Sequence, residues 1–367
     1  MEENDPNVIM VAPSDGSGML HYCSQLANAL SKKATVTAIV DDGADESLFD
    51  GVAVETMDFP GTISEIGSGV VTLWMRLYRR LSTESVDVVH ATVLNPLLVP
   101  PLLALRTQPQ RTVFTLHDVS DHPGAEKYRN EAARRLLVRG VDRVVVHGEY
   151  NARQCRQRYG VDEKLVTINH GAYSFFTDYC DAPIRYDREL LFFGRFRPYK
   201  GIETLLEADR LVSDAVDDYR LTIAGAGRLD VSDEELGDHV TVINEYVPNE
   251  TVCELFSRCR AVVLPYTEAS QSGIVPIAYS FRKPVITTTV GGLPEVVTDG
   301  RTGFTVPPES PAALADACGE LLQDEIAAVE MGDGGHEFKN EHMSWDRITD
   351  SLMREYRGEV EMDSSTM

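Results

Sequence analysis

A basic pair stands at a strand-to-helix turn in the second half of this 367-residue chain. In LLFFGRFRPYKGIETLLEA, an apolar run ends at Gly194 and Arg195, and Lys200 with Gly201 opens a helical pattern. Arginine offers a planar fork of donors and lysine a point charge, so the two can converge on one anion. Such a pair suits a diphosphate leaving group. The alternative is that both are solvated surface cations. The flanking glycines argue against this alternative, and so does the scarcity of lysine, which makes up only seven of the 34 basic residues.

Two Gly-x-Gly turns also follow apolar runs. Gly225 and Gly227 occur in LTIAGAGRL, and Gly16 and Gly18 occur in APSDGSGMLHYCSQL. Small residues let backbone amides approach a phosphate or a sugar. In the N-terminal turn, His21 replaces the third glycine of G-x-G-x-x-G, so a plain tight turn fits that segment as well as a ligand loop does.

A third turn, PYTEASQSGIVPIAYS, carries one acid, Glu268, followed by Ser270, Gln271, Ser272 and Gly273. Small and polar residues between a strand and a helix are typical of a backbone nest that binds an anion. We therefore expect the amides of 270–273 to bind the same phosphate as the basic pair, and Glu268 to contact sugar hydroxyls.

His117 and Glu295 also follow apolar runs. A histidine at a strand end can donate to a leaving or attacking oxygen. A core or capping histidine is the alternative, and it is the more common one for an isolated residue. Glu295, after Gly291 and Gly292, could accept from ribose or sugar hydroxyls; its alternative is a carboxylate placed at a helix start by the helix dipole.

The order of apolar and helical segments predicts two α/β domains. Apolar runs lie at 8–12, 36–40, 86–90, 113–116, 144–146 and 165–168, and again at 190–193, 221–224, 240–243, 261–264 and 285–289. Continuous Val, Ile and Leu runs between helical patterns indicate parallel strands covered on both faces. In doubly wound sheets, ligands bind at the carboxyl ends of the strands. Each turn described above follows such a run.

The composition excludes several classes of protein. A net charge of −24 repels nucleic acid, and 43% hydrophobic residues exclude a disordered acidic chain. The N-terminus has no signal-peptide pattern, and no apolar run is long enough to span a membrane. The six cysteines lack paired spacing, which predicts buried apolar residues in a cytoplasmic, reducing compartment. There is no P-loop, no Asp-x-Asp and no metal-spaced cluster, so we expect no obligatory metal and no cofactor.

The acidic, lysine-poor composition resembles that of proteins from salt-loving organisms. Salt screens the mutual repulsion of surface carboxylates, which otherwise opposes the compact state. We therefore expect a higher melting temperature in molar KCl than in low salt. Equal melting temperatures in the two conditions contradict this hypothesis.

Taken together, FFGRFRPYKGIETLLEA, AGAG, PYTEASQSG, KPVITTTVGGLPEVVTDGRTGFTV and the DGSG turn resemble glycosyltransferase family 4. The resemblance runs from Val8 to about Tyr356. It implies a GT-B fold, with two doubly wound Rossmann-like domains facing across a cleft, and a retaining transferase that uses nucleotide-activated sugars. The implied parts are an acceptor domain (1–175), a donor domain (183–340) and a closing helix (341–360) that packs toward the N-terminal domain.

The resemblance also implies roles for residues of this chain. Arg195 and Lys200 would hold the donor diphosphate, and His117 would approach the reacting sugar. The expected catalytic set is His117, Arg195, Lys200 and Glu268. The expected donor-binding set is Gly16, Gly18, Gly194, Gly225, Gly227, Ser270, Gln271, Ser272, Gly273 and Glu295.

The chain departs from the family pattern in the third turn. The family commonly has two glutamates separated by seven residues, which would fall at Ala269 and Ile277. Glu268 lies one position early, and no acid replaces the second glutamate. Arg282 stands where a small glycine is usual. The reaction class is therefore better defined than the donor nucleotide.

The expected function is transfer of a hexose-type sugar to a glycan or lipid-linked acceptor. Gly16, Gly18 and Asp41 suggest an alternative, a sugar-nucleotide epimerase, and the missing second glutamate suggests a non-catalytic sugar-nucleotide binder. The segment VVTLWMRLYRRL and the basic stretch 127–158 also fit peripheral contact with an anionic membrane. For the first segment alone, an ordinary amphipathic helix facing its sheet is preferred.

Overall fold

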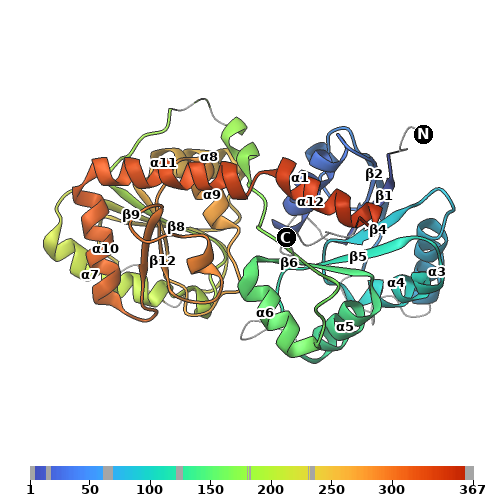
Figure 1. The fold of residues 1–367 in the computed structure, drawn as a ribbon. Helices are drawn as coiled ribbons and strands as arrows, with labels where there is room; N and C mark the ends of the chain where they lie inside the picture. The colour runs from blue at the N-terminus through green and yellow to red at the C-terminus, as the bar shows by residue number, and fades with distance from the viewer. Residues whose placement is uncertain are drawn as a thin grey trace, which may run out of the picture. The chain divides into compact units, whose positions relative to one another are not determined.

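The computed structural model describes residues 5–13, 18–60, 69–120, 127–179, 181, 183–229, 231 and 236–359. The chain divides into two compact units (Figure 1). Unit 1 is Met1–Gly171 together with Trp345–Met367, and unit 2 is Ala172–Ser344. Each unit is built around its own parallel sheet with helices on both faces, as expected for a doubly wound α/β fold.

Within the described residues, unit 1 holds a seven-stranded sheet in the order β3-β2-β1-β4-β5-β6-β7. The strands are β1 (Asn7–Ala12), β2 (Thr35–Asp41), β3 (Ala53–Met57), β4 (Val88–Ala91), β5 (Arg111–Leu116), β6 (Arg143–His147) and β7 (Leu165–Ile168). Every pair is parallel, so all carboxyl ends meet at one edge. The chain order reverses between β1 and β4.

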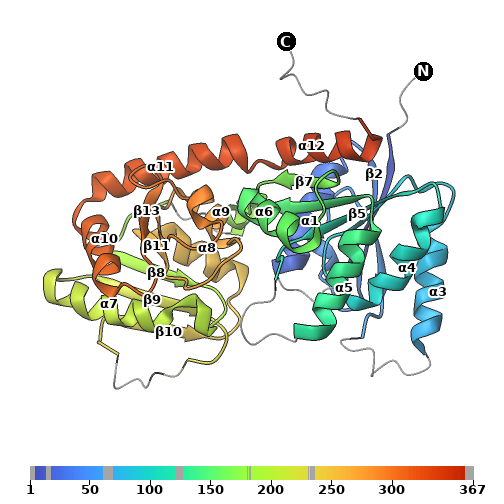
Figure 2. The ribbon, with the colours of Figure 1, turned by 60° about the horizontal axis from the view of Figure 1, so that its bottom comes forward.

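Helices cover both faces of this sheet. They are α1 (Gly18–Leu30), α3 (Gly69–Leu81), α4 (Val99–Ala104), α5 (Lys127–Gly140), α6 (Gly148–Tyr159) and α12 (Trp345–Arg357). Side chains of α3, α4, α5 and α6 form one apolar core with the sheet, and those of α1 and α12 form the other. On the first face, α3, α4 and α5 lie side by side (Figure 2).

The last helix, α12, is tied to the sheet of unit 1 by a buried polar contact. The hydroxyl of Tyr356 lies 2.6 Å from Nδ1 of His90, whose Nε2 lies 2.7 Å from the hydroxyl of Thr115. Burial in this environment lowers the pKa of His90 to about 3. The imidazole is therefore neutral at pH 7, and both of its nitrogens are hydrogen-bonded.

In unit 2, the described residues form a six-stranded parallel sheet in the order β10-β9-β8-β11-β12-β13. The strands are β8 (Glu189–Phe193), β9 (Arg220–Gly225), β10 (Val240–Asn244), β11 (Ala261–Leu264), β12 (Val285–Thr288) and β13 (Gly303–Val306). The helices are α7 (Ile202–Ala215), α8 (Asn249–Arg258), α9 (Ile274–Ser280), α10 (Pro311–Gln323) and α11 (Glu325–His342). Helix α7 packs against α10, and α9 packs against α11 (Figure 1).

Short 3-10 helices complete the described elements. They are η1 (Glu46–Leu48), η2 (Pro96–Leu98), η3 (Leu105–Thr107), η4 (Ser174–Tyr179), η5 (Pro198–Lys200) and η7 (Leu293–Glu295).

The oxidation state of the cysteines differs in part from the prediction. Cys23, Cys155, Cys259 and Cys318 are free and buried, as predicted. Cys253 is disulfide-bonded, so the prediction of six free cysteines was wrong. Spacing along the sequence did not reveal this bond because the fold, and not the local pattern, brings the sulfurs together.

Arg282 occupies a backbone conformation that favours glycine. Its φ is +54°, in the left-handed region that costs a non-glycine residue about 1–2 kcal/mol. Its exposed side chain pairs with Asp333 over 2.5 Å, a contact worth no more than about 1 kcal/mol. We expect Arg282→Gly to raise the free energy of unfolding by up to about 1 kcal/mol. Urea unfolding beside Arg282→Lys, which keeps the strain and the charge, measures the difference; a destabilised glycine variant contradicts the prediction.

Candidate functional site

The loops after β8 and β11 leave the sheet of unit 2 where the strand order reverses. Strand β8 lies between β9 and β11, and the chain proceeds outward in both directions from it. In open α/β sheets, ligands bind in the crevice outside the carboxyl ends at such a switch point. Arg195 and Lys200 belong to the first of these loops, and Glu268 and residues 270–273 belong to the second.

Two glycines allow these loops to contact each other through the backbone. Gly201 has a φ of +68°, and a Cβ atom there would lie 1.8 Å from the carbonyl oxygen of Pro265. The amide of Thr267 donates to the carbonyl of Tyr199 at 2.9 Å. Gly291, in the loop after β12, leaves space in the same way for the carbonyl oxygen of Ala269, which lies in the loop after β11. The backbone of three strand-end loops is thus packed into one edge of unit 2.

Lys200 is positioned by an aromatic ring. Its Nζ lies 3.6 Å from the ring centroid of Tyr266 and 5.2 Å from that of Tyr199. A ring face attracts an ammonium group without using its hydrogen-bond donors. Within the residues that the structure describes, the Lys200 ammonium has no carboxylate partner. The contact therefore holds the charge in place and leaves it available to an anion.

Arg195 is exposed and forms neither a hydrogen bond nor an ion pair with any described residue. Several other arginines form ion pairs with acids, among them Arg258, Arg260 and Arg282. A guanidinium and an ammonium without carboxylate partners in one strand-end loop are both available to an anion.

The turn after β11 is ordered by its serine and tyrosine. The hydroxyl of Ser272 is buried, accepts from the amide of Ile274 at 3.3 Å and lies 3.4 Å from the hydroxyl of Tyr266. Oε1 of Gln271 is buried and accepts no hydrogen bond from the described residues. Glu268 is exposed and forms no ion pair within them. Phosphate binding by the amides of 270–273 remains a prediction.

The two positions at which the family pattern has glutamates are apolar and buried in this structure. Ala269 and Ile277 are 9% and 5% exposed and belong to the apolar core of unit 2. A carboxylate at either position would need a partner to offset its loss of hydration.

Some predicted donor-binding glycines have a packing role in this structure. A Cβ atom at Gly225 would lie 2.0 Å from the carbonyl oxygen of Gly194, and one at Gly227 would lie 2.4 Å from that of Phe196. Both glycines therefore allow the loops after β8 and β9 to approach each other. Glu295 ends η7 and is half-buried. Donor contacts by Gly194, Gly225, Gly227 and Glu295 remain predictions.

The structure says little about the predicted ligand-binding glycines of the turn after β1. Gly18 is the first residue of α1, and a Cβ atom there would meet nothing within 4 Å. Gly16 lies outside the described residues. Neither observation tests the predicted role of this turn in ligand binding.

His117 follows β5 and is 7% exposed. Its Nε2 lies 3.0 Å from the carbonyl oxygen of Thr92, and its Nδ1 lies 3.1 Å from Nε2 of His147. Both ring nitrogens thus have partners within unit 1. These contacts are those of a core histidine, the alternative considered above, and the approach of His117 to a reacting sugar remains a prediction.

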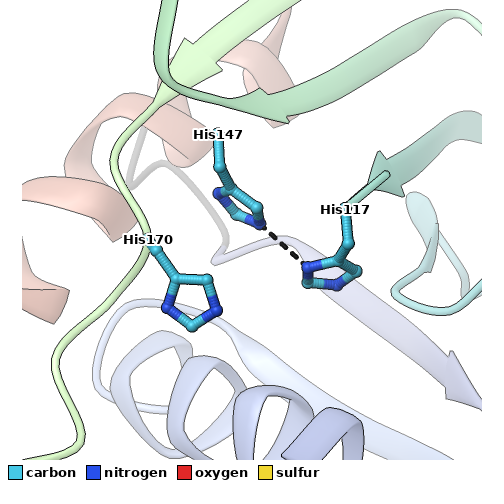
Figure 3. A group of neighbouring side chains, drawn as sticks. All are labelled: His117, His147 and His170. Atoms are coloured by element: carbon cyan, nitrogen blue, oxygen red, sulfur yellow. Dashed lines mark hydrogen bonds between the residues drawn. The ribbon is translucent and has the colours of Figure 1, made fainter. Parts of the chain in front are cut away.

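The fold brings His117 together with two histidines that the sequence did not single out. His147 ends β6, His170 follows β7, and one ring nitrogen of each of the three lies within 4.8 Å of the others (Figure 3). Sequence spacing predicted no such cluster. The three residues are far apart along the chain, and adjacent parallel strands place them at one sheet edge.

Burial lowers the pKa of each histidine in this cluster. The pKa of His170 falls to about 4, that of His147 lies well below its ordinary value, and that of His117 is also lowered. Loss of hydration disfavours the charged form of all three rings, and at His147 and His170 repulsion from neighbouring imidazoles lowers the pKa further. All three rings are therefore neutral at pH 7.

Two family models match the chain, Glycosyltransferase Family 4 over residues 16–172 and Glycosyl transferases group 1 over residues 187–324. The structure of Anabaena HepE in complex with UDP and glucose superposes with a TM-score of 0.76 and 18% identity, covering 96% of this chain and 99% of that one. The two Rossmann-like sheets are thus those of the GT-B class. With both family models matched, the chain belongs to glycosyltransferase family 4.

Curated relatives are similar over part of their length. A D-inositol 3-phosphate glycosyltransferase of Pseudarthrobacter chlorophenolicus is 29% identical over 258 residues, 64% of this chain and 60% of the relative. A GDP-mannose-dependent alpha-(1-6)-phosphatidylinositol monomannoside mannosyltransferase of Mycobacterium tuberculosis is 31% identical over 187 residues, 45% of this chain and 46% of the relative. The matches therefore span 46% to 60% of these two relatives.

Proposed function

We propose that this protein is a retaining glycosyltransferase that moves a hexose-type sugar from a nucleotide-sugar donor to a glycan or lipid-linked acceptor. The observation that carries the proposal is the pair Arg195 and Lys200, two cations without acidic partners among the described residues, at the switch point of unit 2. In a chain of net charge −24, such a pair is best explained by an anionic ligand.

The chemistry of transfer requires charge stabilisation at the donor phosphate. When the bond from the anomeric carbon to the phosphate oxygen breaks, the electron pair stays on that oxygen. Arg195 and Lys200 would stabilise the developing charge, together with the amides of 270–273. The acceptor hydroxyl would form the new bond to the anomeric carbon and transfer its proton to the departing phosphate oxygen. Attack on the same face, which gives retention, is implied by family membership.

This arrangement also supports a proposal about metal. The diphosphate charge would be balanced by the two side chains and the backbone amides, so donor binding would need no divalent cation. The names of the relatives support a nucleotide-sugar donor: one is described as GDP-mannose-dependent, and HepE was solved with UDP and glucose.

Calorimetry against UDP-, GDP-, ADP- and dTDP-sugars tests the proposal. We expect one class of donor to bind, with affinity unchanged by EDTA and weakened in Lys200→Ala. Incubation without acceptor separates the epimerase alternative, which predicts inversion at C2 of the sugar. Tight binding without transfer across a broad acceptor panel would identify a non-catalytic binder. Failure of every donor to bind contradicts the transferase proposal.

We further propose peripheral contact with the cytoplasmic face of an anionic membrane, through the exposed side of α3. No helix among the described residues is both long and apolar enough to cross a bilayer. Leu77 of α3 is buried in the core, as an ordinary amphipathic helix requires, but Val71 and Met75 are 52% and 47% exposed. Arg76 and Arg79, which follow Met75 in the helix, are exposed as well. Exposed apolar side chains next to arginines suit the interface of an anionic bilayer.

The basic stretch 127–158 offers less to a membrane than its composition suggested. Glu131 pairs with Arg134, Arg135 and Arg158, and Arg156 pairs with two other acids. We therefore expect flotation with anionic liposomes to depend on α3 and to be lost in the Val71→Ser/Met75→Ser variant. Absence of co-migration at any salt concentration removes the membrane proposal.

A further inference from the structure

Three buried imidazoles meet at the carboxyl edge of the unit 1 sheet, and one of them belongs to His117, the residue that is expected to approach the reacting sugar. We propose that His117, His147 and His170 bind one divalent transition-metal ion, and that Zn²⁺ suits this ligand set best. The rings come from the ends of the neighbouring strands β5, β6 and β7, and their ligand atoms lie within 4.8 Å of one another (Figure 3). Three imidazoles with one open position are an established zinc coordination pattern.

Backbone hydrogen bonds orient two of the rings for this role. The carbonyl of Thr92 lies 3.0 Å from Nε2 of His117, and the carbonyl of Gly171 lies 3.0 Å from Nδ1 of His170. A carbonyl only accepts, so each of these nitrogens carries the proton. The lone pairs then belong to Nδ1 of His117 and Nε2 of His170. Histidines that bind metal commonly donate their second ring N–H to a carbonyl in this manner.

The third ring completes the set through a change of tautomer. Nε2 of His147 lies 3.1 Å from Nδ1 of His117, close to the spacing of about 3.3 Å between two nitrogens of a tetrahedral zinc site. Without metal, His147 donates from Nε2, and its buried Nδ1 forms no hydrogen bond of ordinary geometry within the described residues. Metal binding would move the proton from Nε2 to Nδ1, with no net release.

The surroundings of the three rings are buried and aromatic. The ring of Tyr22 packs against the three histidines at centroid distances of 4.6, 5.3 and 5.3 Å, and Trp345 packs against Tyr22. Asp118, next to His117, contributes the negative charge that favours a cation here. A metal ion would join the loops after β5, β6 and β7, independently of the donor site in unit 2.

Cobalt substitution on untagged, full-length protein tests the proposal. After dialysis against a chelator, Co²⁺ titration should give the visible absorption bands of tetrahedral coordination, saturating at one equivalent, and Zn²⁺ should displace them. His147→Ala and His170→Ala should each weaken binding at least tenfold. His342→Ala, which removes a partly exposed histidine from unit 2, should bind as the unaltered protein does.

Two results overturn the proposal. The first is the absence of saturable Co²⁺ or Zn²⁺ binding to the unaltered protein, a measurement that does not depend on any variant folding. The second is binding that survives unchanged in both His147→Ala and His170→Ala. Either result would identify the cluster as a neutral hydrogen-bonded core.

Discussion

Arg195→Ala and Lys200→Ala should each lower sugar-transfer turnover by about 100-fold or more while the protein stays folded. Each variant removes a charge that would balance the departing diphosphate. Neither side chain forms an ion pair with the described residues, so its loss leaves no buried carboxylate without a partner. Initial rates with the donor that binds in calorimetry, together with circular dichroism, provide the measurement.

Arg188→Ala is the matched control for this experiment. Arg188 is exposed and directly precedes β8, at the opposite end of the strand from Arg195. The substitution changes the net charge equally, so it isolates position from overall electrostatics. If Arg195 and Lys200 act on one anion, the double variant should lose less than the two single losses combined. Near-normal turnover in both single variants would refute the assignment of the site.

Gly201→Ala should lower the free energy of unfolding of unit 2 by about 3–5 kcal/mol, in the range of the most damaging single substitutions. The new methyl group would lie 1.8 Å from the carbonyl oxygen of Pro265. A backbone oxygen cannot move away as the end of a flexible side chain can, so the loops after β8 and β11 must separate. The residue would also adopt a φ of +68°, which is strained for alanine. Denaturant unfolding followed by circular dichroism measures the loss.

Gly300→Ala separates these two causes. Gly300 lies in the same unit with a φ of +69°, and a Cβ atom there meets nothing within 4 Å. Its substitution introduces the same backbone strain without the collision, so we expect a loss of about 1 kcal/mol. Equal losses in the two variants would show that the contact between the loops contributes nothing to stability.

Sequence patterns predicted most strands of both sheets because buried parallel strands are continuous apolar runs. The strands that they missed lie at the sheet edges. The side chains of β3 are exposed or half-buried except for Met57, so its sequence AVETM lacks a continuous run. Helix α11 was also missed, because its three glycines are poor helix formers. At one of them, Gly332, a Cβ atom would lie 2.0 Å from the carbonyl oxygen of Arg282, so packing against α9 requires a small residue there.

The candidate sites differ in how far the sequence could predict them. Arg195 and Lys200 were predictable because both lie in one turn, five residues apart, at a strand end. The ring of Tyr266 that positions Lys200 comes from the loop after another strand, β11, so only the fold shows this contact. The histidine cluster is entirely tertiary: β5, β6 and β7 each contribute one ring, and no local motif connects them. Side chains that meet only through strand order leave no pattern in the sequence.

The chain order of unit 1 also constrains how the protein is made. Helix α12 supplies Ile348, Leu352, Met353 and Tyr356 to one of the two cores of that unit, yet it follows all of unit 2 in the sequence. During synthesis, the ribosome therefore completes unit 2 before the last part of unit 1 emerges. Until then, the sheet face that α12 covers keeps apolar side chains and His90 without their final partners. Nascent chains that stop short of Tyr356 should accordingly be substrates for chaperones.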